Sequence, residues 1–452
     1  MSNKSSRYVC QNCGSVTSQF FGRCMNCKEW NSIIEEKQNS KSNYHLNHIN
    51  NRPKSLKEIK IEKISRINSG FKELDRVLGG GFVYGSFILL GGEPGIGKST
   101  LVLQTAAKVS LSNKVLYVSA EESLEQIKLR WGRLEQESDN LHIFSENNLS
   151  IIIEEIKKTK PSFAIIDSIQ AINNLEMESS SGSVSQVRSC SSELQQLAKE
   201  YGITILIIGH VTKEGSLAGP KTLEHLVDVV LNFEGDNIAS HRLLRSIKNR
   251  FGATLELGIF EMNENGLHEV TNSSSSFTNN ENVSGLATTI TREGTRCFAV
   301  DIQALVNKSF YNNPRRTTTG IHLNRLHQIL AVIEKRIGLK LSQHDCYIAT
   351  AGGFDINDPS SDLGIAISLI SSHKNRKPIE SCSFVGELGL NGQVRKTNHL
   401  QNRIEESLRL GFKKIMIPYS KEDLNRKYTN IDIIEVLNIN EAIHKGLEQK
   451  NS

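Results

Sequence analysis

The sequence contains neither a long apolar run nor a strong excess of one charge. No apolar stretch approaches the roughly 18 residues that suggest a membrane span, so no membrane partner is expected. Residues 1–4 lack the apolar region of a secretory signal, which predicts a cytoplasmic protein. The formal net charge of +5 is small for 452 residues, and it permits a nucleic-acid partner without indicating one.

Length and composition indicate a globular protein with more than one domain. Hydrophobic residues make up 38% of the chain and charged residues 23%, which is typical of globular proteins. A chain of 452 residues is too long for one compact domain. We therefore expect two or three domains.

A complete phosphate-binding loop is present at Gly92–Ser99, whose sequence fits G-x-x-x-x-G-K-[ST] at every fixed position. An apolar strand at 86–90 and a helix at 99–109 are expected around it, and this context disfavours an ordinary glycine-rich turn. Backbone N–H groups, the helix N-terminus and Lys98 would bind the phosphates of ATP, and Ser99 would hold Mg²⁺. The predicted nucleotide-binding residues are Gly92, Glu93, Pro94, Gly95, Ile96, Gly97, Lys98, Ser99 and Thr100.

Four of the eight cysteines form two C-x-x-C pairs, Cys10 with Cys13 and Cys24 with Cys27. Two such pairs present four thiolates to one metal, which predicts a closed tetrahedral Zn²⁺ site without a catalytic role. Two disulfides or redox dithiols are the alternative, which a reducing cytosol disfavours. The other four are expected to be plain buried thiols: Cys190, Cys297, Cys346 and Cys382.

Two polar segments divide the chain into three expected domains. Residues 35–58 are rich in Asn, Lys and Ser, and residues 271–284 are rich in Ser and Asn, so both are interpreted as linkers. They predict a four-cysteine finger at 1–34, an ATPase domain at 59–270 and a third domain at 285–452.

Strands and helices alternate after the phosphate loop, which predicts an α/β fold with a parallel sheet and helices on both faces. The strands are expected at 115–119, 141–144, 163–166 and 203–208. The helices are expected to end near 134, to begin near 150 and to span 184–200.

Polar residues follow the strands, where open α/β sheets bind their ligands. Asp167 is placed to hold the hydration shell of Mg²⁺, and Glu121 is placed to orient the attacking water. His210 could sense the γ-phosphate. Ordinary helix caps are the alternative for each of them.

Further segments resemble the RadA (Sms) family of bacterial DNA repair proteins along nearly the whole chain. They are Trp30-Asn31, the loop at 91–100, Tyr117–Ser123, Gly182–Arg188, Gly209–Gly215 and Lys248–Gly252, the last being the most specific. The resemblance implies a RecA-type ATPase fold in a hexameric, DNA-dependent ATPase that drives branch migration in recombinational repair after DNA damage. It also implies ATP, Mg²⁺ and Zn²⁺ as cofactors, and single-stranded and branched DNA and the RecA recombinase as partners.

The same resemblance implies roles for four residues. Glu121 matches the catalytic glutamate of RecA-type enzymes, and His210 matches the sensor at the end of a strand. Lys248 and Arg250 match a basic pair that reaches a neighbouring subunit's nucleotide or the DNA. Their spacing supports this role, because residues two apart on a strand share a face and two cations suit phosphate oxygens. A solvated strand face is the alternative.

The third domain resembles the proteolytic domain of Lon, through Gly386–Arg395 and Lys414–Pro418, and is expected to be an α+β domain without proteolytic activity. Ser360 takes the place of the Lon nucleophile. A serine needs a base, and Gln401 stands where Lon has a lysine. Lys396 lies five residues from that position, so it could serve as the base only if the fold brought it to Ser360 in a different arrangement from that of Lon. The domain is expected to serve assembly and DNA contact.

A basic segment lies near the start of this domain, between residues 305 and 340. Its seven cations would follow a DNA backbone, although a solvated helix face fits the sequence equally well. The cations are Lys308, Arg315, Arg316, Arg325, Lys335, Arg336 and Lys340, against one acid, Glu334.

Three functions stay open on the sequence: a motor on DNA, an ATP-dependent Lon-like serine protease or its relic, and a clock or signalling ATPase of the KaiC type. The cysteine finger together with the segment 248–252 favours the motor over the KaiC type. ATP hydrolysis measured with and without single-stranded DNA would discriminate best.

Overall fold

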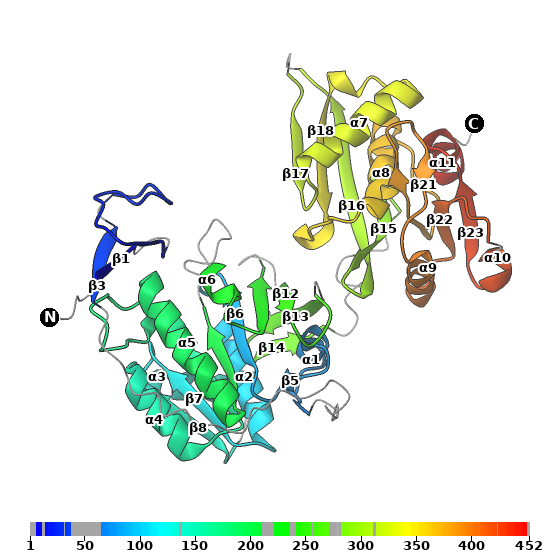
Figure 1. Cartoon of the computed structure of the whole chain (residues 1–452). Helices are drawn as coiled ribbons and strands as arrows, with labels where there is room; N and C mark the ends of the chain where they lie inside the picture. The colour runs from blue at the N-terminus through cyan, green and yellow to red at the C-terminus, as the bar shows by residue number, and fades with distance from the viewer. Residues whose placement is uncertain are drawn as a thin grey trace, which may run out of the picture. The chain divides into compact units, whose positions relative to one another are not determined.

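The protein is described from a computed structural model, in which the chain divides into two compact units, Met1–Glu269 and Val270–Ser452 (Figure 1). The described residues are 6–10, 14–30, 32–37, 65–134, 138–209, 221–235, 241–254, 256–270, 278, 282–310, 313–422 and 424–449. None of the helices that these residues form is both long and apolar enough to cross a membrane. The finer domain boundaries expected from composition stay predictions.

The N-terminal segment forms a small antiparallel sheet in the order β2-β1-β3. Its strands are β1 (Ser6–Cys10), β2 (Val16–Thr17) and β3 (Ile33–Lys37). The buried core under them consists of Cys10, Cys24 and Ile33. Two cysteines and one isoleucine, with Tyr8 and Cys27 packed against them, bury too little apolar surface to hold such a segment, which is the usual situation in metal-dependent modules.

A nine-stranded sheet organises the rest of the first unit, in the order β14-β13-β12-β11-β6-β10-β9-β7-β8. Six strands are parallel: β6 (Phe87–Gly92), β7 (Val115–Ser119), β8 (Leu141–Ser145), β9 (Phe163–Asp167), β10 (Thr204–Ile208) and β11 (Val229–Glu234). Three more extend the sheet antiparallel: β12 (His241–Asn249), β13 (Leu257–Asn263) and β14 (Gly266–Glu269). The parallel part was predicted, and the antiparallel extension was not.

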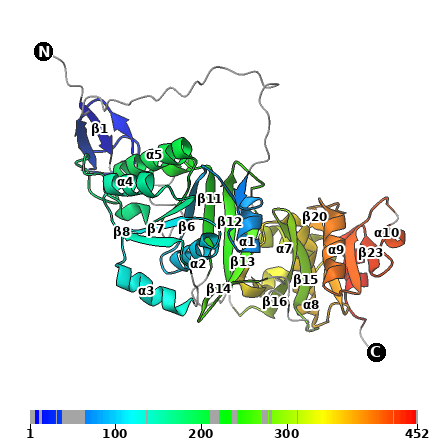
Figure 2. The ribbon, with the colours of Figure 1, turned by 90° about the horizontal axis from the view of Figure 1, so that it is seen from below.

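Helices cover both faces of the parallel strands, as predicted (Figure 2). The helices of this unit are α1 (Lys72–Leu78), α2 (Lys98–Ser110), α3 (Leu124–Arg133), α4 (Leu149–Thr159), α5 (Val184–Tyr201) and α6 (Lys221–Glu224). A short ribbon, β4 (Arg66–Ile67) with β5 (Phe82–Val83), precedes β6. Sequence signals begin and end several of these helices: Ser123 forms a capping box with Gln126 before α3, and Gly202 ends α5 in the left-handed conformation.

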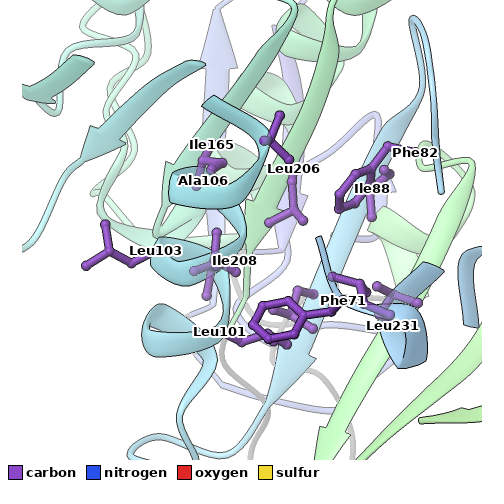
Figure 3. Packing of buried hydrophobic residues seen from close by; sticks show 14 of the residues in the cluster. Phe71, Phe82, Ile88, Leu101, Leu103, Ala106, Ile165, Leu206, Ile208 and Leu231 are labelled. Atoms are coloured by element: carbon purple, nitrogen blue, oxygen red, sulfur yellow. The ribbon is translucent and has the colours of Figure 1, made fainter. Parts of the chain in front are cut away.

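The central strand β6 feeds two separate hydrophobic cores. Ile88 and Leu90 pack into the core that contains α2, whereas Phe87 and Leu89 pack into the core that contains α4 and α5. Alternate residues of a strand point to opposite faces, so an unbroken apolar strand is what a sheet covered on both faces requires. Figure 3 shows the first core, in which Leu101 and Ala106 of α2 lie over the strand residues.

The second unit contains a mixed seven-stranded sheet in the order β17-β18-β16-β15-β19-β22-β23. Its strands are β15 (Leu286–Glu293), β16 (Arg296–Lys308), β17 (Arg316–Thr319), β18 (His344–Thr350), β19 (Cys382–Phe384), β22 (Lys414–Pro418) and β23 (Asp432–Val436). A two-stranded ribbon of β20 (Glu387–Leu388) and β21 (Val394–Arg395) stands apart from it.

Helices also lie on both faces of this second sheet. The main ones are α7 (Leu323–Ile337), α8 (Asp362–Lys374), α9 (Leu400–Arg409), α10 (Leu424–Lys427) and α11 (Ile439–Gly446). Gly364 of α8 approaches Thr289 of β15, whereas Ile404 of α9 shares a core with the next residue, Ile290. Neighbouring residues of a strand point to opposite faces, so α8 and α9 lie on opposite faces of the sheet.

Candidate nucleotide site and metal centre

The phosphate loop joins the carboxyl end of β6 to the first turn of α2, and two of its glycines are required by their surroundings. Gly92 and Gly97 have φ angles of 153° and 114°, which favour glycine. A Cβ atom on Gly97 would lie 2.5 Å from Cε of Met262, and one on Gly92 would lie 2.5 Å from the carbonyl oxygen of Phe233. Strands β11 and β13 therefore form the wall behind the loop.

Lys98 lies inside this loop, with only 4% of its surface exposed. Its Nζ donates hydrogen bonds of 2.8 Å to the carbonyl oxygens of Gly92 and Glu93. Burial lowers the pKa of Lys98 to about 8, a shift that the negative charges of Asp167 and Glu121 partly oppose. The ammonium is thus held at the centre of the loop, within the electrostatic reach of both carboxylates.

Asp167 ends β9 and lies beside the start of α2. The hydroxyl of Tyr117 donates to Oδ2 of its carboxylate at 2.5 Å. Burial raises the pKa of Asp167, and the nearby hydroxyls of Tyr117 and Ser99 oppose the rise. The structure therefore brings together Ser99 and Asp167, the two residues that the sequence analysis assigned to Mg²⁺.

Glu121 follows β7, the strand next to β9 in the sheet. The hydroxyl of Ser168, the residue after Asp167, donates a hydrogen bond to the Glu121 carboxylate. The two carboxylates that act on Lys98 thus lie in different environments, because Asp167 is half-buried and Glu121 is exposed. His210 and the rest of the segment 210–220 lie outside the described residues, and the final described residue of that strand end is Gly209.

Lys248 and Arg250 both contact the segment 224–228. Nζ of Lys248 donates to the carbonyl oxygens of Glu224 at 2.5 Å and Val227 at 2.8 Å. Arg250 forms an ion pair of 2.9 Å with Asp228, and half of the arginine side chain is exposed. Strand β12 ends at residue 249, one residue short of the expectation that both cations lie on one strand, although the amide of Arg250 still bonds the carbonyl of Asp228 in the register of the β11–β12 ladder.

The cysteine segment contains two turns of the same kind. The amide of Gly14 bonds the carbonyl of Cys10, and the amide of Lys28 bonds the carbonyl of Cys24, both at 2.9 Å. The residues at these turns, Gly14 and Lys28, have φ angles of 70° and 61°. Each turn is the knuckle that a C-x-x-C pair needs to aim its thiolates at one metal.

The sulfur atoms of Cys10, Cys24 and Cys27 all lie within 4.8 Å of one another. Cys13 lies outside the described residues. Three converging soft sulfur donors fit Zn²⁺ in a tetrahedral site better than hard cations such as Mg²⁺. The cysteines that the sequence analysis set aside are buried, and burial raises the pKa of each: Cys190, Cys297, Cys346 and Cys382.

Sequence reasoning missed three residues near the loop. Tyr117 sits in an apolar strand, where an aromatic residue is typical core, and only its contact with Asp167 distinguishes it. Ser168 follows Asp167 and contacts Glu121. Arg242, a buried residue of β12, donates from Nε to the carbonyl of Ile96 in the loop at 3.1 Å. Tyr117 begins one of the segments that resemble the RadA family, but no local pattern indicates its contact or those of Ser168 and Arg242, since each contact joins segments far apart in the sequence.

In the second unit, Ser360 and Gln401 do not form a nucleophile and base. Only 2% of the Ser360 surface is exposed, and within the described residues its Oγ has no hydrogen-bond partner. Gln401 is exposed at the start of α9. Among the cations of the basic segment, Arg316 donates to the carbonyl of Leu341 at 2.8 Å, and Arg325 pairs with Asp362.

Three family models match successive parts of the chain. The model described as a rubredoxin metal binding domain matches residues 8–35, which include the cysteine cluster. The model described as an AAA domain matches residues 52–216, which include the phosphate loop. The model described as subunit ChlI of Mg-chelatase matches residues 322–421.

Curated proteins are similar to the chain over almost its full length. The DNA repair protein RadA of Listeria monocytogenes is 44% identical over 98% of this chain and 98% of its own length. The DNA repair protein RadA of Bacillus subtilis is 44% identical over 99% of this chain and 100% of its own length. Among solved structures, a KaiC-like protein of Pyrococcus horikoshii is 20% identical, with 46% of this chain and 99% of that chain covered and a TM-score of 0.39.

Proposed function

The chain belongs to the RadA family of DNA repair proteins, with a RecA-like ATPase fold, an N-terminal zinc ribbon and a C-terminal Lon-like domain, and we propose that it is a DNA-dependent motor. ATP hydrolysis in the first unit would drive the movement of branch points in recombination intermediates. The protein would act in the cytoplasm during repair of DNA damage.

One observation supports hydrolysis above the others: Lys98, Ser99, Asp167 and Glu121 come from three separate segments and meet at the same end of the parallel strands. Lys98 would bind the β- and γ-phosphates, and its hydrogen bonds to the loop carbonyls would be exchanged for bonds to phosphate oxygens. Backbone N–H groups of the loop would complete the phosphate site.

The donors around Ser99 suit Mg²⁺, because a hydroxyl and a carboxylate are hard oxygen ligands. Ser99 would ligate the ion and Asp167 would hold its bound water. Mg²⁺, when bound, neutralises charge on the β- and γ-phosphates. Glu121 would accept a proton from the attacking water, and the hydroxyl of Ser168 keeps its carboxylate in place.

The metal centre at the N-terminus would hold Zn²⁺ through Cys10, Cys24, Cys27 and, from the sequence, Cys13. Its role would be structural, since four thiolates leave no open position for catalysis. A folded ribbon of this kind could then contact DNA or a partner protein, which would explain why it accompanies a motor domain.

Single-stranded and branched DNA are the proposed substrates, and the RecA recombinase is a proposed partner. The family supports DNA as the substrate, and the half-exposed guanidinium of Arg250 supports a phosphate contact. We also propose a homo-oligomer, with six subunits as the expected ring. In such a ring Lys248 and Arg250 would reach either the nucleotide of a neighbouring subunit or the DNA.

ATP hydrolysis with and without single-stranded DNA tests the proposal. We expect turnover to rise when DNA is added, and we expect a labelled four-way junction to be converted into two duplexes only with hydrolysable ATP. A rate of ATP turnover that is the same with and without DNA would contradict the proposed motor and would favour a signalling ATPase. ATP-stimulated proteolysis would instead favour the Lon-like protease, and the buried Ser360 hydroxyl, which has no hydrogen-bond partner in the described part of the chain, argues against it.

A further inference from the structure

Tyr117 is a core residue that has a polar contact at the nucleotide site. Its side chain is 1% exposed and packs into the same hydrophobic core as α2. The ring belongs to this core, whereas the hydroxyl at its end donates a hydrogen bond to Oδ2 of Asp167 at 2.5 Å. Phenylalanine would fill the same apolar space, so the hydroxyl rather than the ring is the feature that needs an explanation.

The register of the sheet accounts for this contact. Strands β7 and β9 are parallel, with Tyr117 opposite Ile165 and Ser119 opposite Asp167. Residues two apart on a strand share a face, so Tyr117 and Asp167 point to the same side of the sheet. This is the side of α2, because Ile165 and Tyr117 belong to the core that includes α2. A long ring at position 117 therefore reaches diagonally to the carboxylate.

One contact holds the Asp167 carboxylate from the sheet: the hydroxyl of Tyr117 donates to its Oδ2. Ser99, at the start of α2, lies near the same carboxylate and opposes the rise of its pKa. Ser99 would turn to Mg²⁺ when the ion binds, whereas Tyr117, a residue of β7, would keep its bond to Asp167. Hydrogen bonds of this kind, made to a group that holds a metal or its water, set the direction of that group and its affinity for the metal.

We propose that Tyr117 is a positioning residue for Mg²⁺, whose hydroxyl fixes one oxygen of Asp167 so that the other faces the ion's bound water. The inference rests on the proposed ATPase function, because it assigns the Mg²⁺ site to Ser99 and Asp167. Tyr117 itself touches neither nucleotide nor metal in this assignment. Its removal should therefore change the Mg²⁺ requirement and leave metal-free nucleotide binding as it is.

The test is the affinity of the full-length protein for a fluorescent ATP analogue, measured across a Mg²⁺ titration and in EDTA. For Tyr117→Phe we expect the Mg²⁺ concentration at half-maximal effect to rise by roughly 10-fold, the lower end of the range for lost partners of metal-binding groups. We expect the affinity in EDTA to match the parent. Placing p-amino-phenylalanine at position 117 restores a donor at the same point and should restore most of the Mg²⁺ response.

Tyr428→Phe provides the matched control, because the hydroxyl of Tyr428 also donates to a carboxylate, that of Glu405 at 3.3 Å, but belongs to the second unit. It should keep the parent's Mg²⁺ response. An unchanged Mg²⁺ requirement in Tyr117→Phe would overturn the proposal, and so would an equal loss of affinity in EDTA, which would assign the hydroxyl to the fold. Neither result depends on DNA-stimulated turnover, so failure of the motor proposal would be recognised separately.

Discussion

Arg325 holds Asp362, the first residue of α8, in a two-point ion pair inside the second unit. Nε of Arg325 donates to Oδ1 at 2.6 Å, a second guanidinium nitrogen donates to Oδ2, and the amide of Leu388 adds a bond of 2.8 Å. Only 1% of the Asp362 side chain is exposed. Burial outweighs these contacts and raises the pKa of Asp362 to about 6.

The raised pKa of Asp362 predicts a pH dependence of folding. The unfolded carboxyl has a pKa of about 3.9, so between about pH 4 and pH 6 the folded state binds more protons than the unfolded state. Its contribution is fully present below about pH 4 and is lost as the pH rises through about 6. Relative to Asp362→Asn, the parent's free energy of unfolding should fall by up to about 3 kcal/mol over this window.

Urea unfolding of the full-length protein at several pH values between 4 and 7 would measure this difference. Asp355→Asn is a suitable control, because it makes the same chemical change at an exposed position of the same unit. A constant difference between parent and Asp362→Asn at every pH would show that Asp362 titrates normally.

Lys98→Ala should lower ATP turnover by on the order of 100-fold or more, because the phosphates lose the full charge at the centre of the loop. Steady-state phosphate release measures the effect. Lys108→Ala, on the same helix but packed over the ring of Phe71, should retain turnover. Normal ATP turnover in Lys98→Ala would contradict the assignment of the phosphate site to the loop at Gly92–Ser99.

Cys24→Ala should release zinc while the ATPase core stays folded. The sulfur of Cys24 belongs to the cluster of three, and a structural zinc site with three thiolates binds far more weakly than one with four. Metal content after dialysis, together with ATP binding, measures both parts. Cys190→Ala changes a buried thiol outside the cluster and should retain the metal. Equal zinc in both variants would contradict the metal centre.

Arg250→Ala should impair DNA strand processing and leave ATP binding nearly unchanged. Arg250 is half-exposed, but its partner Asp228 is buried and would keep the hydrogen bond from the Phe87 amide while losing its cation, so the loss of stability should be about 1–3 kcal/mol. Lys248→Ala should have the same functional effect with a similar cost, because two carbonyl groups lose their donor. Branch-migration assays measure strand processing, and nucleotide-binding assays measure ATP affinity. A loss of ATP binding in Arg250→Ala would contradict the role proposed for Lys248 and Arg250.

The purified protein should cleave neither casein nor peptides, with or without ATP. Ser360, the candidate nucleophile, is buried. Gln401, which stands at the position of the base, is an exposed amide and cannot accept the serine proton. Ser360→Ala should therefore have no effect in a fluorescent-casein assay. Cleavage that needs ATP and disappears in Ser360→Ala would establish a protease instead.

The sequence was sufficient to predict the features that depend on short spacings. The loop pattern placed Lys98 and Ser99 at the start of α2, and the apolar strand before Asp167 placed that residue at the strand end. Parallel strands end at a common edge, so the loop and these carboxylates had to be neighbours. The two knuckles followed from the C-x-x-C spacing in the same way.

The remaining features depend on contacts between distant segments. Nothing near Tyr117 indicates Asp167, and nothing near Asp362 indicates Arg325, because each pairing is created by the register of strands or the packing of helices. The antiparallel strands after β11 were missed because the alternation of strand and helix that guided the prediction stops there. Strand β12 ends one residue before Arg250, and local patterns do not fix the last residue of a strand.

The wall behind the phosphate loop has a consequence for synthesis on the ribosome. A nascent chain synthesised as far as β11 carries the whole phosphate-binding motif, yet Met262 of β13, which packs against Gly97, has still to be translated. At ordinary elongation rates this interval lasts a few seconds, about 1 to 6. During that time the phosphate loop lacks part of the wall behind it, and the wall is completed only when the last hairpin of the first unit has been made.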